Sequence, residues 1–160
     1  MIKSSCTAFL IEIENIQKAI AIDIDEIRGF ILQTLRILGV PSADLSIVIV
    51  TDRKIHYLNK RYLAHDYPTD VITFDLQEEG RSTRGGVESL DGEIIVSATT
   101  ALRMAKDFGV APRTELVLYV VHGILHLSGF DDRIPAARRQ MRKKESEIMG
   151  QLGLRISSRT

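Results

Sequence analysis

Residues 114–127, TELVLYVVHGILHL, constrain the fold of this chain more than any other segment. Apolar side chains occupy nearly every side of a helix drawn through them, and such a helix in a globular protein lies in the middle of the fold. The other elements must then cover it on several sides. With 160 residues, 44% of them hydrophobic, the chain has the size of one domain that buries a core. We expect residues 1–160 to form a single domain around this helix.

Strand and helix patterns alternate along the rest of the chain. Runs rich in β-branched residues predict four strands, at 8–14, 45–50, 71–76 and 93–97. Helical spacing predicts four further helices, at 23–39, from 52, at 99–107 and from 135. Asp23 with Glu26 resembles a capping box, Asp52 is expected to cap the second helix, and the polar segment 77–90 is expected to be a surface loop. The prediction is an α+β fold with about four strands in a mixed sheet and a buried central helix.

Charge and cysteine content limit the possible functions. The 21 lysines and arginines equal the 21 aspartates and glutamates, so nucleic-acid binding would need a local basic patch. The single cysteine, Cys6, cannot form an internal disulfide, which is typical of a reducing compartment. No apolar run approaches the ~20 residues of a membrane helix, and the apolar run before Glu12 is too short for a signal peptide. We therefore expect a cytoplasmic protein.

Two histidines, His122 and His126, lie four residues apart inside the central helix. Residues at this spacing stand one above the other, with Cβ atoms ~5–6 Å apart, so both imidazoles can face one ion. Gly129 falls where the helix should end, and a left-handed glycine there would turn the chain back and bring Asp132 to the same ion. Two nitrogens and one oxygen, with a fourth position open to water, describe a catalytic zinc site, because structural zinc normally takes four protein ligands.

Two other interpretations of the histidine pair stay open. Core histidines can bind backbone carbonyls without a metal, although two imidazoles buried side by side with no partner are costly. The spacing of the two histidines, Gly129 and Asp132 also resembles metzincin-type proteases, which need a glutamate directly after the first histidine as general base. Gly123 occupies that position. We therefore expect no peptidase activity.

The segment from His122 to Asp132, HGILHLSGFDD, resembles the motif H-G-x-L-H-L-x-G-[YF]-D-H of the YbeY-type ribosomal-RNA maturation factors, which are single-strand endoribonucleases. It fits that motif at every position except the last. Other blocks resemble the family's LN…Y…PTDVLSF, GDI.IS and EL..L segments in the same order, at 58–74, 92–97 and 115–118. The resemblance runs from about residue 45 to residue 150.

The last position of the motif is a departure from the family, which usually has a third histidine there. Aspartate also ligates zinc, so the resemblance implies a metal site of His122, His126 and Asp132, with a somewhat weaker Lewis acid. Asp131 is a rival for the third ligand, but it matches the family's own aspartate, which we interpret as a turn-forming residue or an outer partner of the site. Nickel and iron accept the same ligands as zinc.

The expected RNA contacts also follow from the resemblance. Thr69 and Asp70 are expected to line the cleft. Leu63 stands where the family commonly has an arginine that is proposed to engage RNA. Arg61, two residues earlier, is a candidate to replace that arginine. Local basic clusters lie at 53–54, 60–61 and 138–144. No catalytic side chain beyond the metal site can be assigned.

The resemblance therefore implies a zinc-dependent endoribonuclease, a hydrolase of phosphodiester bonds in single-stranded RNA. It would act in ribosomal RNA processing, at the 3′ end of the small-subunit RNA, with the ribosomal small subunit as a partner and no DNA or membrane partner. The alternative is a ribosome-associated assembly factor with a structural or vestigial metal site. The Asp132 and Leu63 departures motivate that alternative.

Overall fold

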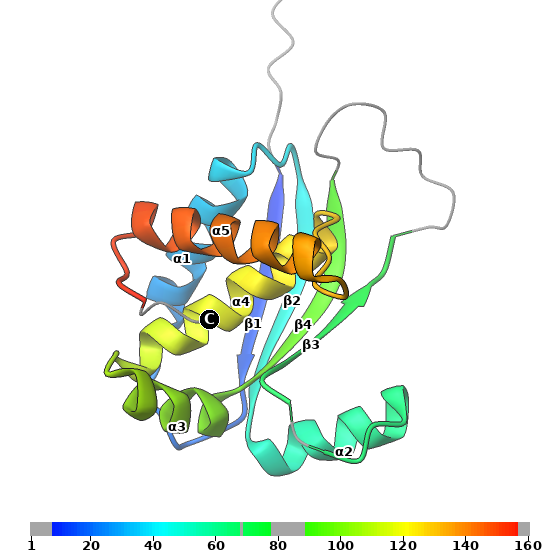
Figure 1. Cartoon of the computed structure of the whole chain (residues 1–160), viewed down its shortest axis with the longest axis vertical. Helices are drawn as coiled ribbons and strands as arrows, with labels where there is room; N and C mark the ends of the chain where they lie inside the picture. The colour runs from blue at the N-terminus through cyan, green and yellow to red at the C-terminus, as the bar shows by residue number, and fades with distance from the viewer. Residues whose placement is uncertain (1–7, 68, 78–88, 157–160) are drawn as a thin grey trace, which may run out of the picture.

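The computed structural model describes residues 8–67, 69–77 and 89–156 (Figure 1). Cys6 and nearly all of the expected loop at 77–90 lie outside these residues. Among the described residues, no single helix has both the length and the apolar character to cross a membrane. Only two consecutive helices counted together, at 98–108 and 112–127 and bent by 116°, reach that length and composition.

Four strands form one sheet in the order β1-β2-β4-β3. β1 (Phe9–Asn15) runs parallel to β2 (Ala43–Val50), and β2 runs parallel to β4 (Leu90–Ser97). β3 (Val71–Asp75) is antiparallel to β4 at one edge. The predicted α+β fold with a mixed four-stranded sheet is confirmed, and each of the four predicted strands is present.

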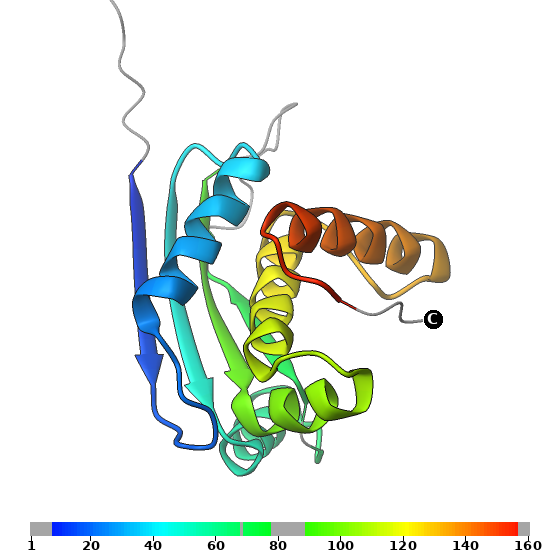
Figure 2. The same ribbon diagram turned by 90° about the vertical axis from the view of Figure 1, so that its left-hand side faces the viewer.

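In the described part of the chain, five helices accompany the sheet: α1 (Ile24–Ile37), α2 (Asp52–Leu63), α3 (Ala98–Phe108), α4 (Pro112–Leu127) and α5 (Pro135–Gln151). α1 and α4 lie on one face of the sheet, and α5 lies across α4 on the side away from the sheet (Figures 1 and 2). α2 packs at one end of the opposite face, where Ile55 forms a hydrophobic cluster with Ile72 and Ile95. Because successive strand residues point to opposite faces, Ile94 faces α4 while Ile95 faces α2.

The first residues of α1 and α2 are fixed by different caps. Asp23 caps α1 as predicted, since its carboxylate accepts hydrogen bonds from the N–H groups of Asp25 at 3.0 Å and Glu26 at 3.2 Å. The prediction that Asp52 caps α2 is wrong. The cap is Thr51, whose hydroxyl accepts from the N–H of Lys54 at 3.4 Å.

Asp52 instead ties the start of α2 to the start of α3. Its carboxylate accepts hydrogen bonds from the Ser97 hydroxyl at 2.6 Å, from Arg103 at 3.0 Å and from Thr100. Partial burial by itself would raise the pKa of Asp52, but these three hydrogen bonds outweigh it and hold that pKa below its ordinary value. The ionised carboxylate therefore fixes α2 beside the neighbouring strand and helix.

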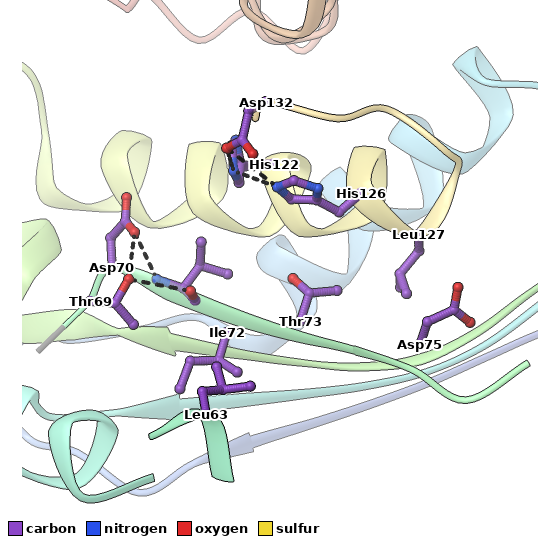
Figure 3. Close-up of a pocket in the computed structure, with 11 residues that line it drawn as sticks. Leu63, Thr69, Asp70, Ile72, Thr73, Asp75, His122, His126, Leu127 and Asp132 are labelled. Carbon is purple, nitrogen blue, oxygen red and sulfur yellow. Dashed lines mark hydrogen bonds and ion pairs between the residues drawn. The ribbon is translucent and has the colours of Figure 1, made fainter. Parts of the chain in front are cut away.

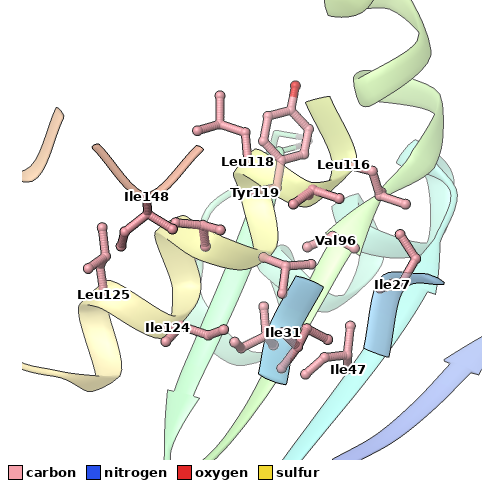
Figure 4. Packing of buried hydrophobic residues seen from close by; sticks show 14 of the residues in the cluster. Ile27, Ile31, Ile47, Val96, Leu116, Leu118, Tyr119, Ile124, Leu125 and Ile148 are labelled. Atoms are coloured by element: carbon pink, nitrogen blue, oxygen red, sulfur yellow. The ribbon is translucent and has the colours of Figure 1, made fainter. Parts of the chain in front are cut away.

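α4 is the central helix that the sequence predicted. Its side chains pack against Ile47 and Val96 of the sheet, against Ile27 and Ile31 of α1, and against Ile148 of α5 (Figure 4). Leu116, Ile124 and Leu125 have no exposed surface. The all-round apolar pattern thus reflects contacts with the sheet, with α1 and with α5.

Two glycines set how closely α4 lies on the sheet. A Cβ atom built on Gly123 would lie 2.8 Å from Cγ2 of Ile94, far inside an ordinary carbon contact of ~3.5–4.0 Å. Ile94 is completely buried, so its branched side chain has little room to move. Gly92 of β4 lies opposite Leu127, the last residue of α4. A Cβ atom built on Gly92 would lie 2.7 Å from both methyl carbons of Leu127. A larger residue at either position would push α4 away from β4.

Candidate metal centre

His122 and His126 lie one turn apart near the C-terminal end of α4 and line a cleft (Figure 3). Their Nε2 atoms are 3.1 Å apart, and their ring planes are inclined by 80°. Both side chains are partly exposed, at 25% for His122 and 30% for His126. The two imidazoles therefore present Nε2 atoms to one point at the surface of an otherwise buried helix.

The chain turns back directly after α4. Gly129 has a φ of +100°, its N–H donates to the carbonyl of His126 at 3.1 Å, and the N–H of Phe130 donates to the carbonyl of Leu125 at 3.0 Å. This pair of bonds is a Schellman motif, which needs a left-handed residue at the position of the glycine. The reversal carries Asp132 back over the histidines, as the sequence predicted.

Asp132 completes a group of three ligand atoms. Its Oδ2 lies 3.5 Å from Nε2 of His122 and 3.6 Å from Nε2 of His126. Ligands held at ~2.05 Å around a tetrahedral zinc are ~3.3 Å apart, so the three atoms have nearly the spacing of three tetrahedral corners. Two imidazoles and a carboxylate also suit divalent transition metals chemically. The three residues fit a metal ion.

Asp131, the rival ligand, has a different set of contacts. Its carboxylate accepts a hydrogen bond from Nε of Arg133 at 2.8 Å and another from the N–H of Arg133 at 3.0 Å. These bonds hold the pKa of Asp131 below its ordinary value. Asp131 therefore stabilises the turn, and it lies outside the group formed by the two histidines and Asp132.

Glu145 of α5 contacts the edge of the His122 ring that carries Nδ1, on the side away from the three ligand atoms. Its carboxylate oxygen accepts a hydrogen bond from Nδ1 of His122, which fixes the tautomer with the lone pair on Nε2. Burial by itself would lower the pKa of His122, but the hydrogen bond and the charge of Glu145 raise it above its ordinary value. The sequence patterns did not predict this role of Glu145. The available signal was its place on the buried stripe between Met141 and Ile148.

Replacing Glu145 with glutamine is expected to lower zinc affinity by ~10–100-fold, the range found when an outer partner of a metal-binding histidine is lost. The amide keeps the size of the side chain but removes the charge that orients the imidazole. Competition with a zinc-binding dye measures the change. Glu147→Gln is the matched control, since Glu147 lies on the same helix and pairs with Lys144 at 3.7 Å. Equal affinities for the two variants would contradict the orienting role of Glu145.

A cleft of about 380 Å³ adjoins the three ligand atoms. One wall is α4 with Asp132, and the other is formed by β3, the segment before it and the end of α2 (Figure 3). Thr69 and Asp70 line this cleft, as expected from the sequence, and so does Leu63. The Asp70 carboxylate accepts a hydrogen bond from the N–H of Val71 at 3.0 Å, so it also shapes the turn into β3.

Arg61 lies elsewhere on α2. Its Nη1 donates to the hydroxyl of Tyr57 at 3.3 Å, and its guanidinium carbon lies 5.7 Å from the centre of the Tyr62 ring. The residues that line the cleft include Leu63 but not Arg61. The cleft therefore brings together five of the six candidate residues: His122, His126, Asp132, Thr69 and Asp70. The sixth, Arg61, lies outside its lining, and its RNA-binding role stays a prediction.

The position after the first histidine cannot supply the general base of a protease. The Cβ direction of Gly123 points at Ile94 in the sheet, whereas the flanking His122 lines the cleft. A glutamate at 123 would therefore enter the core instead of reaching the metal site. The expected lack of peptidase activity stays a prediction.

Comparison with known proteins identifies the family. The family model described as endoribonuclease YbeY matches residues 12–153. The chain belongs to the endoribonuclease YbeY family. Endoribonuclease YbeY of Pelotomaculum thermopropionicum is 36% identical over 148 residues, which cover 89% of this chain and 96% of that protein. Endoribonuclease YbeY of Desulfitobacterium hafniense is 42% identical over 116 residues, covering 70% of this chain and 73% of its relative.

A solved structure has a similar fold. The solution structure of a Thermotoga maritima protein, 26% identical in sequence, covers 90% of this chain and 92% of its own, with a TM-score of 0.59. The resemblance inferred from the histidine motif is confirmed, and with it the expectation of an enzyme that hydrolyses RNA. Asp132 and Leu63 are the positions where this YbeY chain departs from the expected motif.

Proposed function

We propose that this YbeY protein is a zinc-dependent endoribonuclease that cuts single-stranded RNA at the cleft between α4 and β3. Membership in the family supports a role in ribosomal RNA processing. The proposal includes the 3′ end of the small-subunit RNA as substrate and the ribosomal small subunit as partner. It also includes a cytoplasmic location and action as one domain of 160 residues.

One observation carries the metal-dependent chemistry. Three ligand atoms from His122, His126 and Asp132 lie at nearly tetrahedral spacing beside a cleft, and a site with three protein ligands is typical of catalytic zinc. Zinc suits a set of two imidazoles and one carboxylate, and nickel or iron is the alternative occupant. A bound zinc supplies Lewis acidity toward a phosphate oxygen or a water molecule.

The side chains of this chain have separate tasks in that reaction. His122, His126 and Asp132 hold the ion, and Glu145 keeps His122 in the tautomer that can bind it. Asp70 places a further carboxylate in the cleft, and its negative charge contributes to the raised pKa of His122. Leu127 and Leu63 add apolar surface to the cleft.

Zinc-loaded protein is expected to cleave a single-stranded RNA, and Asp132→Ala is expected to lose both zinc and cleavage. Asp131→Ala should retain both, because the Asp131 carboxylate binds Arg133. Asp132→His should retain zinc, since histidine is an equally suitable ligand. Metal analysis of the purified variants and gel assays of RNA cleavage measure these outcomes. If Asp131→Ala loses the metal while Asp132→Ala keeps it, the ligand assignment is wrong.

The second candidate is a ribosome-associated assembly factor with little catalytic activity. The cleft favours it in one respect, because Leu63 contributes an apolar side chain where the family commonly has an arginine. A wild-type protein that binds zinc and RNA but leaves the RNA intact would support this candidate over the enzyme.

A further inference from the structure

The cleft has an unfavourable charge for its proposed substrate. Three carboxylates line it, from Asp70, Asp75 and Asp132, and no lysine or arginine is among the described residues that line it. RNA binding depends on positive charge that neutralises phosphates. One divalent ion only partly balances three carboxylates, so a cation near the cleft is needed.

Arg138 lies beside the metal ligands. It is an exposed residue in the first turns of α5, and its Nε donates a hydrogen bond to the backbone carbonyl of Asp132 at 3.2 Å. Met141, three residues on, is buried, and Glu145, seven residues on, contacts His122. Residues at these spacings share one helix face. Arg138 therefore lies on the face of α5 that is turned toward the metal centre.

Among the residues that the structure describes, no carboxylate forms a salt bridge with Arg138. Its described bond goes to a carbonyl through Nε, whereas the neighbouring Arg133 pairs with the Asp131 carboxylate at 2.8 Å. A guanidinium is planar, so the bond from Nε also fixes the position of the two terminal nitrogens of Arg138. Their N–H groups form a fork of donors that suits a phosphate. Arg61 is held near Tyr57 and Tyr62 instead.

We propose that the Arg138 guanidinium binds a phosphate of the RNA strand in the cleft and supplies the cation that Leu63 does not provide. The inference rests on the proposed function, because it assumes that RNA reaches the metal centre. This assignment places the phosphate contact at the start of α5, beside Asp132, instead of on α2. The bond from Nε to the Asp132 carbonyl fixes the guanidinium at a constant place relative to the metal ligands.

The test compares Arg138→Ala with wild type in zinc content, in kcat/KM for a single-stranded RNA, and in RNA affinity after a chelator has removed the metal. The affinity for a short fluorescent RNA of mixed sequence is measured by anisotropy at several salt concentrations. We expect Arg138→Ala to keep its zinc and to bind RNA about tenfold more weakly, because a hydrogen bond to a charged group is lost. The salt dependence of binding should become shallower by ~0.7, the value for one phosphate contact on a single strand.

Three further variants make the result specific. Arg138→Lys should recover part of the affinity, since the charge returns without the fork. Lys106→Ala removes one exposed charge from α3 and should leave RNA binding unchanged. A loss with Arg61→Ala but not with Arg138→Ala would place the contact on α2 and overturn the inference.

Metal content separates the remaining outcomes. Loss of zinc in Arg138→Ala would show that the residue only holds the Asp132 loop, which also overturns the inference. If wild type binds RNA but does not cut it, the proposed function fails while the Arg138 contact is still decided by the anisotropy measurement.

Discussion

His126→Ala is expected to abolish both the cleavage of single-stranded RNA and the retention of one zinc per chain. The variant leaves His122 and Asp132 as a two-ligand site, and the two remaining atoms are 3.5 Å apart. Loss of an outer partner alone costs ~10–100-fold in metal affinity, so loss of a direct ligand should cost more than ~100-fold. Metal analysis and a gel assay with a labelled RNA measure the two effects in the same preparation.

The matched control for this result is His56→Ala. His56 lies on α2, where its Nε2 pairs with Asp66 at 2.8 Å, and it is not among the residues that line the cleft. This variant removes one imidazole and should keep zinc and activity. If His126→Ala and wild type show the same residual cleavage, a contaminating nuclease is the source and the proposed enzyme activity is wrong.

Gly123→Ala is expected to lower the free energy of unfolding by about 1–3 kcal/mol, the usual cost of adding a methyl group to a packed core. The new Cβ atom would lie 2.8 Å from Cγ2 of Ile94, so either α4 or β4 must shift. The shift would also move His122, whose Nδ1 is held by Glu145 of α5. Urea unfolding of the metal-free protein measures the stability, and dye competition measures zinc affinity.

Gly29→Ala is the matched control for Gly123→Ala. Gly29 lies within α1, it is exposed, and a Cβ atom built on it meets nothing within 4 Å. Alanine at an exposed helix position is worth about 0.5–1 kcal/mol more than glycine. The two substitutions should therefore change stability in opposite directions. A stabilising effect at both positions would show that α4 has room to move away from the sheet at no cost.

Local patterns in the sequence were sufficient for most of the fold. The all-round apolar pattern of 114–127 predicted the central helix, and β-branched runs predicted the strands, because both signals depend on residues close together in the chain. The same holds for the Asp23 cap and for the return of the chain at Gly129. The cap of α2 was misplaced by one residue, because Asp52 binds Ser97 and Arg103, far along the chain.

The sequence by itself determined the histidine pair, the turn that returns Asp132, and the family. Each depends on spacing within about ten residues or on a contiguous motif. Only the tertiary structure decided which groups surround that site. Glu145 reaches His122 from α5, and Ile94 of β4 requires glycine at 123. Both contacts join residues more than twenty positions apart. No local periodicity encodes such geometry, so it emerges only when the helices pack on the sheet.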